Sequence, residues 1–151
     1  MKPKYHRLRN PKHRPVFLLP YIDFDGQYAG HTDCERLSLG WAQYGPPTSA
    51  SLKTFRYVRG KWSRQSEEVP LHRAVDLTLL LAKAVGGIRQ SRLKAISLPV
   101  GTFKNQVHEV PLEPLCGDDR ESQAFATLIG DPEVRSRLKK LRDVLNGLQN
   151  L

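Results

Sequence analysis

Residues 36–44, RLSLGWAQY, carry the pattern that decides the fold. Apolar side chains occupy every second position and alternate with polar or small ones: Leu37, Leu39 and Trp41 against Arg36, Ser38 and Gly40. A period of two residues is typical of a strand that buries one face. A glycine in the middle of the segment weighs against a helix, whose interior it destabilises. The sequence therefore favours a strand here.

A helix over residues 33–44 is the competing interpretation. Thr32 and Glu35 have the spacing of a capping box, and the stretch Gly45-Pro46-Pro47 would end a helix. One helical face would then hold Cys34, Leu37, Trp41 and Tyr44. We prefer the strand because another strand pattern follows, but the sequence alone leaves the choice open.

The neighbouring segments support an antiparallel arrangement. Residues 21–24 resemble a short strand, followed by Asp25-Gly26, a favoured hairpin turn. Residues 51–64 read as a strand, a tight turn at Arg59-Gly60 and a return strand. This hairpin carries five cations and no acid, interleaved with aromatic rings: Lys53, Arg56, Arg59, Lys61 and Arg64 with Phe55, Tyr57 and Trp62. Such a mixture suits single-stranded nucleic acid, but it also fits a sheet with packed rings and solvated charges.

Helices are predicted over residues 70–85 and in two C-terminal segments. Pro70 and Gly86-Gly87 bound the first helix, whose second half is apolar on nearly every side. We expect it to be a central, buried helix, with His72, Arg73 and Asp76 in local ion pairs on its rim. Short strands are expected near residues 93–98 and 105–112, and helices within 119–130 and from Pro132 onward. The predicted class is α+β, with an antiparallel sheet of about four to six strands and a C-terminal helical pair.

The charge of the chain is concentrated at its N-terminus. Its 151 residues carry a net charge of +9, and residues 1–15 hold six cations and no acid: Lys2, Lys4, Arg7, Arg9, Lys12 and Arg14. Three prolines in the same stretch oppose helix and strand pairing. We expect residues 1–15 to be a basic, extended, solvated arm and residues 16–151 to be a single α+β domain. Such an arm suits a phosphate backbone, a solubilising tail or an acidic surface.

Cysteine content and hydropathy indicate the compartment. Cys34 and Cys116 lie far apart and form no CxxC pair, so neither a zinc knuckle nor a disulfide framework is predicted. No apolar run is long enough to span a bilayer. A cytoplasmic protein without membrane contact is expected. The sequence also lacks a phosphate-binding glycine loop, so we predict no nucleotide cofactor.

A polar cluster precedes the decisive strand. If that strand continued backward, His31, Asp33 and Glu35 would share its buried face, which is costly unless they are paired or bind a metal. With Asp23 and Asp25 they could form the divalent-metal or acid/base site of a hydrolase or nuclease. A polar loop explains the same residues without chemistry. We favour the loop and predict no metal site.

The sequence therefore favours a small, non-catalytic module that binds nucleic acid or an acidic partner through the arm and the hairpin. Thirteen residues are the candidate contacts: Lys2, Lys4, Arg7, Arg9, Lys12, Arg14, Lys53, Arg56, Tyr57, Arg59, Lys61, Trp62 and Arg64. The alternatives are a metal-dependent hydrolase or nuclease that uses Asp23, Asp25, His31, Asp33 and Glu35, and a protein-interaction module that does not bind nucleic acid. The sequence determines neither the kind of nucleic acid nor the oligomeric state.

Overall fold

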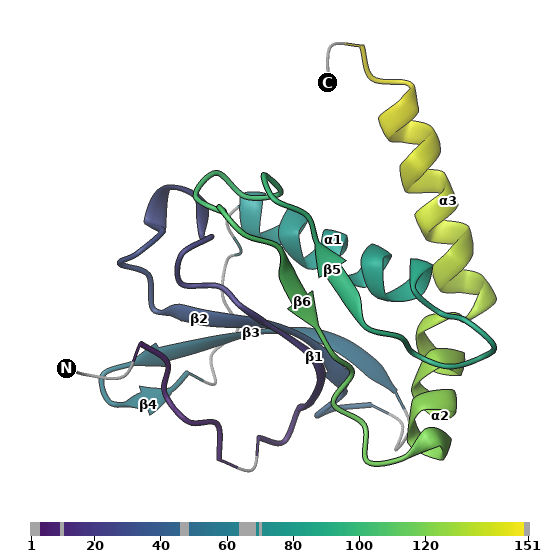
Figure 1. Ribbon diagram of the computed structural model, residues 1–151, viewed down its shortest axis with the longest axis horizontal. Coiled ribbons are helices and arrows are strands. Elements are labelled where there is room, and N and C mark those ends of the chain that lie inside the picture. The colour runs from purple at the N-terminus through teal and green to yellow at the C-terminus, as the bar shows by residue number, and fades with distance from the viewer. Residues whose placement is uncertain (1–3, 10, 46–48, 64–68, 70, 150–151) are drawn as a thin grey trace.

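The computed structural model describes residues 4–9, 11–45, 49–63, 69 and 71–149 (Figure 1). Its main element is a four-stranded antiparallel sheet in the order β1-β2-β3-β4. The strands are β1 (Arg14–Pro20), β2 (Cys34–Trp41), β3 (Ala50–Val58) and β4 (Lys61–Trp62). Together with three helices and a second small sheet, they confirm the predicted α+β class.

β2 confirms the strand prediction, and the helix alternative is wrong. The strand lies between β1 and β3, where Leu37 pairs with Leu19 on one side and with Thr54 on the other. Leu37 and Leu39 are buried in the core, as the alternation predicts. The ring of Trp41 meets the edge of Phe125 with centroids 5.1 Å apart. Pro46 and Pro47 lie outside the described residues.

The expected strand over residues 21–24 is wrong, because the first strand lies earlier. β1 takes the apolar run Val16–Leu19, and the chain then bends away at Tyr21. Asp25 precedes a short 3-10 helix, η1 (Gly26–Tyr28), instead of a hairpin turn. The Asp25 side chain is fully buried and accepts hydrogen bonds from other elements, which holds this segment against the helix that follows.

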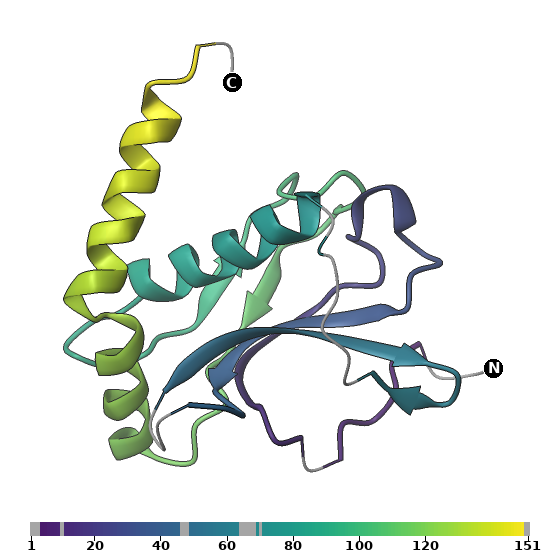
Figure 2. The same cartoon turned by 180° about the vertical axis from the view of Figure 1, so that it is seen from behind.

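The helix α1 (Leu71–Gly86) lies across one face of the sheet (Figures 1 and 2). On the inner side of the helix Leu80 and Ala84 are buried, whereas Leu71 and Val75 on its outer side are 88% and 64% exposed. The helix therefore covers the sheet without being enclosed. Pro70, its expected first residue, lies outside the described residues.

The elements that follow α1 in the chain are a two-stranded sheet and two helices. β5 (Ile96–Leu98) and β6 (Val110–Leu112) pair antiparallel, and the backbone N–H of Leu115 donates to the Val16 carbonyl at 2.7 Å. The predicted C-terminal helical pair is confirmed as α2 (Asp119–Ile129) and α3 (Pro132–Asn146). Asp118 and Asp131 cap the two helices. No helix among the described residues is both long and apolar enough to cross a membrane.

The opposite face of the sheet is covered by the N-terminal arm. Figures 1 and 2 show the described arm residues before β1 running below the sheet, on the side away from α1. His13 is 1% exposed, and Ser38 of β2 beneath it is fully buried. The described arm residues therefore lie against the sheet, where His13 is buried on the second face of β2, while the side chains of Lys4, Arg7, Arg9, Lys12 and Arg14 are exposed.

Gly40 is required where the arm enters β1. A Cβ atom on this residue would lie 2.2 Å from the Arg14 carbonyl oxygen, which is a backbone atom that cannot rotate away. We expect Gly40→Ala to lower the free energy of unfolding by about 1–3 kcal/mol, the usual cost of overpacking. Urea denaturation measures this. Gly86→Ala is the matched control, because a Cβ there meets nothing within 4 Å. Equal stability of the two variants would contradict the prediction.

Candidate functional site

His6 is the first anchor of the arm. Its backbone N–H donates to Glu35 Oε2 at 2.8 Å, and its ring Nδ1 contacts Glu35 Oε1. The Arg36 guanidinium donates through Nη2 to the His6 carbonyl oxygen at 2.8 Å. Two consecutive charged residues of β2 therefore hold one residue of the arm. Glu35 is 4% exposed, and this pairing compensates for its burial.

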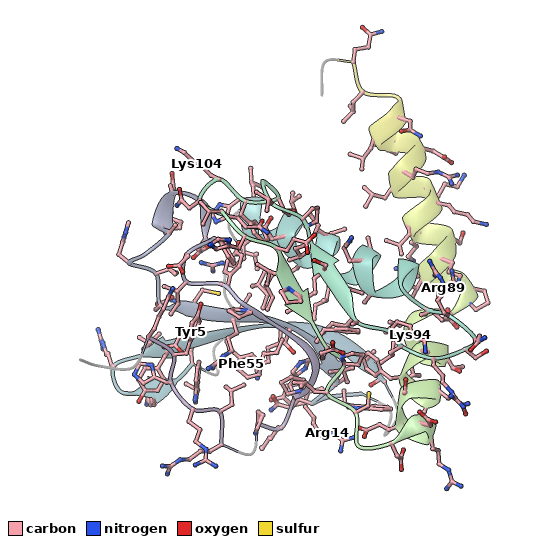
Figure 3. The ribbon with its side chains drawn as sticks, in the orientation of Figure 1. Tyr5, Arg14, Phe55, Arg89, Lys94 and Lys104 are labelled. Carbon is pink, nitrogen blue, oxygen red and sulfur yellow. The ribbon has the colours of Figure 1, made fainter. Side chains whose placement is uncertain are left out.

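Aromatic contacts join the arm to the β3–β4 hairpin. The rings of His6 and Tyr57 stack with centroids 3.6 Å apart and an interplanar angle of 13°. The Arg36 guanidinium lies over two rings, 5.3 Å from the centroid of Tyr5 in the arm and 5.8 Å from that of Trp62 in β4. These contacts make the arm and the hairpin one continuous surface. Figure 3 shows Tyr5 and Phe55 toward the same end of the sheet.

The hairpin turn is where the sequence places it. Arg59 and Gly60 have φ angles of 49° and 82°, so both residues adopt the left-handed conformation that suits a two-residue hairpin turn. β3 and β4 pair through Tyr57 with Trp62 and Val58 with Lys61. Arg59 and Lys61 are exposed on either side of Gly60.

The aromatic rings of the hairpin pack against one another and against the arm; Phe55 is buried, and Tyr57 and Trp62 are half-buried. Phe55 is 4% exposed, and its ring meets His13 and Trp62 edge-on with centroids 5.8 Å apart in each case. Tyr57 also meets Trp62, at 5.1 Å, while His6 covers one of its faces. The rings therefore support the arm, and a base that stacked on Tyr57 would compete with His6.

The predicted cations differ in their partners. Three are paired with carboxylates: Lys4 with Asp23, Arg14 with Glu121 at 3.0 Å, and Arg56 with Asp33 at 2.6 and 2.7 Å. The Lys53 ammonium group lies 5.3 Å from the Phe55 ring centroid. Lys2 and Arg64 lie outside the described residues. Five cations are exposed and form no ion pair with a described carboxylate: Arg7, Arg9, Lys12, Arg59 and Lys61. We call these five the arm–hairpin surface.

The five residues of the alternative hydrolase site do not converge. Asp23 pairs with Lys4, Asp33 with Arg56 and Glu35 with His6, while His31 lies exposed in the loop before β2. Asp25 points into the protein and bonds to other groups. Within the described part of the chain, no three His, Cys, Asp or Glu side chains lie where they could hold one metal ion. The arrangement provides separate ion pairs and no shared acid/base centre.

Asp25 is the centre of a buried polar network that connects η1 to α1. Its carboxylate accepts hydrogen bonds from Thr32 Oγ1 at 2.5 Å, His72 Nε2 at 2.8 Å and Arg73 Nη2 at 2.8 Å. Burial raises the pKa of Asp25, but these hydrogen bonds, led by that from Arg73, outweigh it and hold the pKa below its usual value. Nearby, the Tyr21 hydroxyl donates to Asp76 Oδ2 at 2.5 Å.

This network corrects the expectation of local ion pairs on α1. His72, Arg73 and Asp76 bond to Asp25 and Tyr21, which lie far away in the sequence, because the helix packs on the segment that follows β1. A signal for the network exists in the sequence. Arg73 stands seven residues before Leu80 and eleven before Ala84, on the buried side of the helix. A cation at such a position needs a buried acid as its partner.

A pocket of about 460 Å³ is lined by a different set of residues from those of the arm–hairpin surface. Residues 23–24, 29–30 and 105–110 contribute its walls, and its titratable side chains are Asp23, His108 and Glu109. Two acids and no lysine or arginine make this pocket unsuitable for a polyanion.

The fold and this surface define the class as a small α+β protein with a basic arm docked on its sheet. Residues 6–97 match the model of a family of unknown function, DUF6530, and the chain belongs to that family. The matched region includes β1 to β4, α1 and the arm from His6 onward, whereas β6, α2 and α3 lie outside it. No curated protein and no solved structure matches the chain.

The second anchor of the arm makes stability depend on pH. His13 Nε2 and Nδ1 lie 2.9 Å from Ser38 Oγ and 3.0 Å from Ser51 Oγ. Burial, with a smaller contribution from Lys53, lowers the pKa of His13 from 6.5 to about 4. Below pH 6.5 the unfolded chain binds a proton that the folded protein excludes. We therefore expect His13 to lower the free energy of unfolding as the pH falls from 6.5 to about 4, by about 2–3 kcal/mol in total.

Chemical denaturation across this pH range measures the effect. His13→Gln retains hydrogen-bonding groups but does not titrate, so its stability should fall less steeply than that of the unaltered protein. His31→Gln, the same exchange at an exposed histidine, is the matched control. Parallel curves for His13→Gln and the unaltered protein would rule out His13 as the source.

Proposed function

We propose that the protein binds the phosphate backbone of nucleic acid through the arm–hairpin surface. The observation that carries this proposal is the stack of His6 on Tyr57, which holds this part of the arm at the end of β3 that leads into the hairpin turn. Arg7 follows His6 directly, and Arg59 and Lys61 flank the turn two and four residues beyond Tyr57. Cations from two distant parts of the chain thereby gain the proximity that phosphate binding requires.

The docked arm also lowers the cost of binding. A solvated arm would lose conformational freedom on contact with a ligand, whereas this arm is already held by Glu35, Arg36 and Tyr57. The exposed side chains of Arg7 and Arg9 therefore project from backbone that is ordered before the ligand arrives. This arrangement supports binding by the folded surface.

The proposed contact is with phosphates and is independent of base sequence. The rings of Phe55, Tyr57 and Trp62 are occupied within the protein, so they do not supply the stacking platform of a single-strand site. A surface of exposed cations without such a platform recognises charge and backbone spacing. Affinity should then follow the phosphate density of the ligand, which favours a duplex over a single strand.

Paired charge variants test this proposal by fluorescence anisotropy with labelled DNA and RNA duplexes over a range of salt concentrations. We expect the double variants Arg7→Ala/Arg9→Ala and Arg59→Asn/Lys61→Ala each to weaken binding. Each should also reduce the slope of log K against log salt by about 2, since two phosphate contacts are lost. Asparagine is used at position 59 because it tolerates the left-handed backbone there.

Lys94→Ala/Lys104→Ala is the matched control and removes the same charge. Both lysines are exposed, and Figure 3 shows Lys104 on the side of the sheet that α1 covers and Lys94 near the base of α3. An equal loss in this control would attribute binding to net charge alone and refute the proposal. Lack of duplex binding at low salt would also refute it. Displacement of the duplex by polyglutamate at matched charge would support an acidic protein partner instead.

A further inference from the structure

α3 leaves the body of the protein after its first two turns. Val134 and Leu138 are partly buried and pack against the core. Beyond them the helix continues outward, and Figures 1 and 2 both show its C-terminal part standing clear of the other elements. No residue of α3 is fully buried. More than half of this helix therefore lacks the tertiary packing that normally stabilises a helix.

The side that packs at the base of α3 continues as an apolar stripe along the free part. Its members within the helix are spaced alternately by four and three residues: Val134, Leu138, Leu141 and Leu145. Leu148 follows two residues after the helix ends. This is the a/d spacing by which one helix packs against another. Leu141, Leu145 and Leu148 are 37%, 43% and 51% exposed, and Val144 beside them is 62% exposed. A continuous exposed stripe of this kind marks a contact surface.

The flanks of the stripe are basic. With Leu138 and Leu145 at a positions, Arg135 and Arg142 occupy e positions and Arg137 a g position. The helix carries five cations and two acids in all. Arg137 pairs with Glu133 at 2.7 Å and Arg142 with Asp143 at 3.3 Å, but both pairs are well exposed and hence weak. A partner could therefore replace them with its own carboxylates.

Charge selects the kind of partner. In a parallel pair of α3 helices, Arg137 of one copy would face Arg142 of the other, and an antiparallel pair would bring Arg135 and Arg142 together. Both arrangements place like charges across the contact and disfavour a second copy of this chain. We infer that α3 docks an amphipathic helix of a partner protein, with leucine-like residues on its contact face and glutamate or aspartate at its flanks.

Two designed helical peptides test this inference with the full-length protein. Both have leucine at a and d positions, but one has glutamate and the other lysine at e and g. We expect the glutamate peptide to bind at least about tenfold more tightly than the lysine peptide in fluorescence anisotropy. The double variant Arg137→Glu/Arg142→Glu should reverse this preference, because it exchanges the charge on both flanks.

The apolar stripe is tested separately with Leu145→Gln/Leu148→Gln, which should weaken the glutamate peptide by at least about tenfold. These side chains are exposed, so the variant should keep the circular dichroism and melting temperature of the unaltered protein. Leu115→Gln, at a residue of similar exposure outside α3, is the control and should leave binding unchanged. Equal binding of the two peptides, or full binding by the leucine variant, would overturn the inference. So would a dimer of the unaltered protein in sedimentation equilibrium that Leu145→Gln/Leu148→Gln dissociates.

Discussion

The burial of β2 on both faces is the constraint on which the structure depends. An antiparallel strand usually buries one face and leaves the other in water, yet six of the eight residues of β2 are fully buried. Leu37 and Leu39 point into the apolar core beside α1. The other side carries polar residues, which need hydrogen-bond partners once water is excluded. The arm supplies them, because His13 meets Ser38 and His6 meets Glu35.

Because of this constraint the arm has two roles, and its amino-acid composition alone does not show which residues serve each role. Its histidines and Tyr5 face the sheet, where they form hydrogen bonds, stacks and a cation–π contact. Arg7, Arg9 and Lys12, which alternate with these inward residues, are exposed. The same short segment thus completes a core and presents charge. The stack of His6 on Tyr57 brings Arg7 toward the hairpin turn, and the proposed function depends on that position.

Local patterns were sufficient to predict the main elements. The alternation over Leu37, Leu39 and Trp41, the Arg59-Gly60 turn and the C-terminal helices all follow from spacing that neighbours in the sequence impose. The docked arm and the Asp25 network could not be predicted from the sequence, because their contacts join residues that lie far apart in it.

Gly40 carries a signal that local alternation does not reveal. A glycine within a strand marks the close approach of another backbone, here that of Arg14. Charge and ring content predict the candidate contacts, but they do not distinguish Arg7, which is exposed, from Arg56, which is bound to Asp33.

The position of the arm in the chain affects the order in which the protein can fold. Residues 4–9 and 11–13 leave the ribosome before β2 and β3, but the groups that hold them belong to those two strands, up to Tyr57. The arm must therefore wait for the strands to be synthesised and paired before it can dock. Its anchors are mainly side-chain contacts to a sheet that has its own ladder of backbone hydrogen bonds. The arm thus forms a separate cooperative unit, which can open while the strands remain paired. While the arm is open, the polar side of β2 is exposed to water, and Glu35 and Ser38 exchange the arm's histidines for water as hydrogen-bond partners.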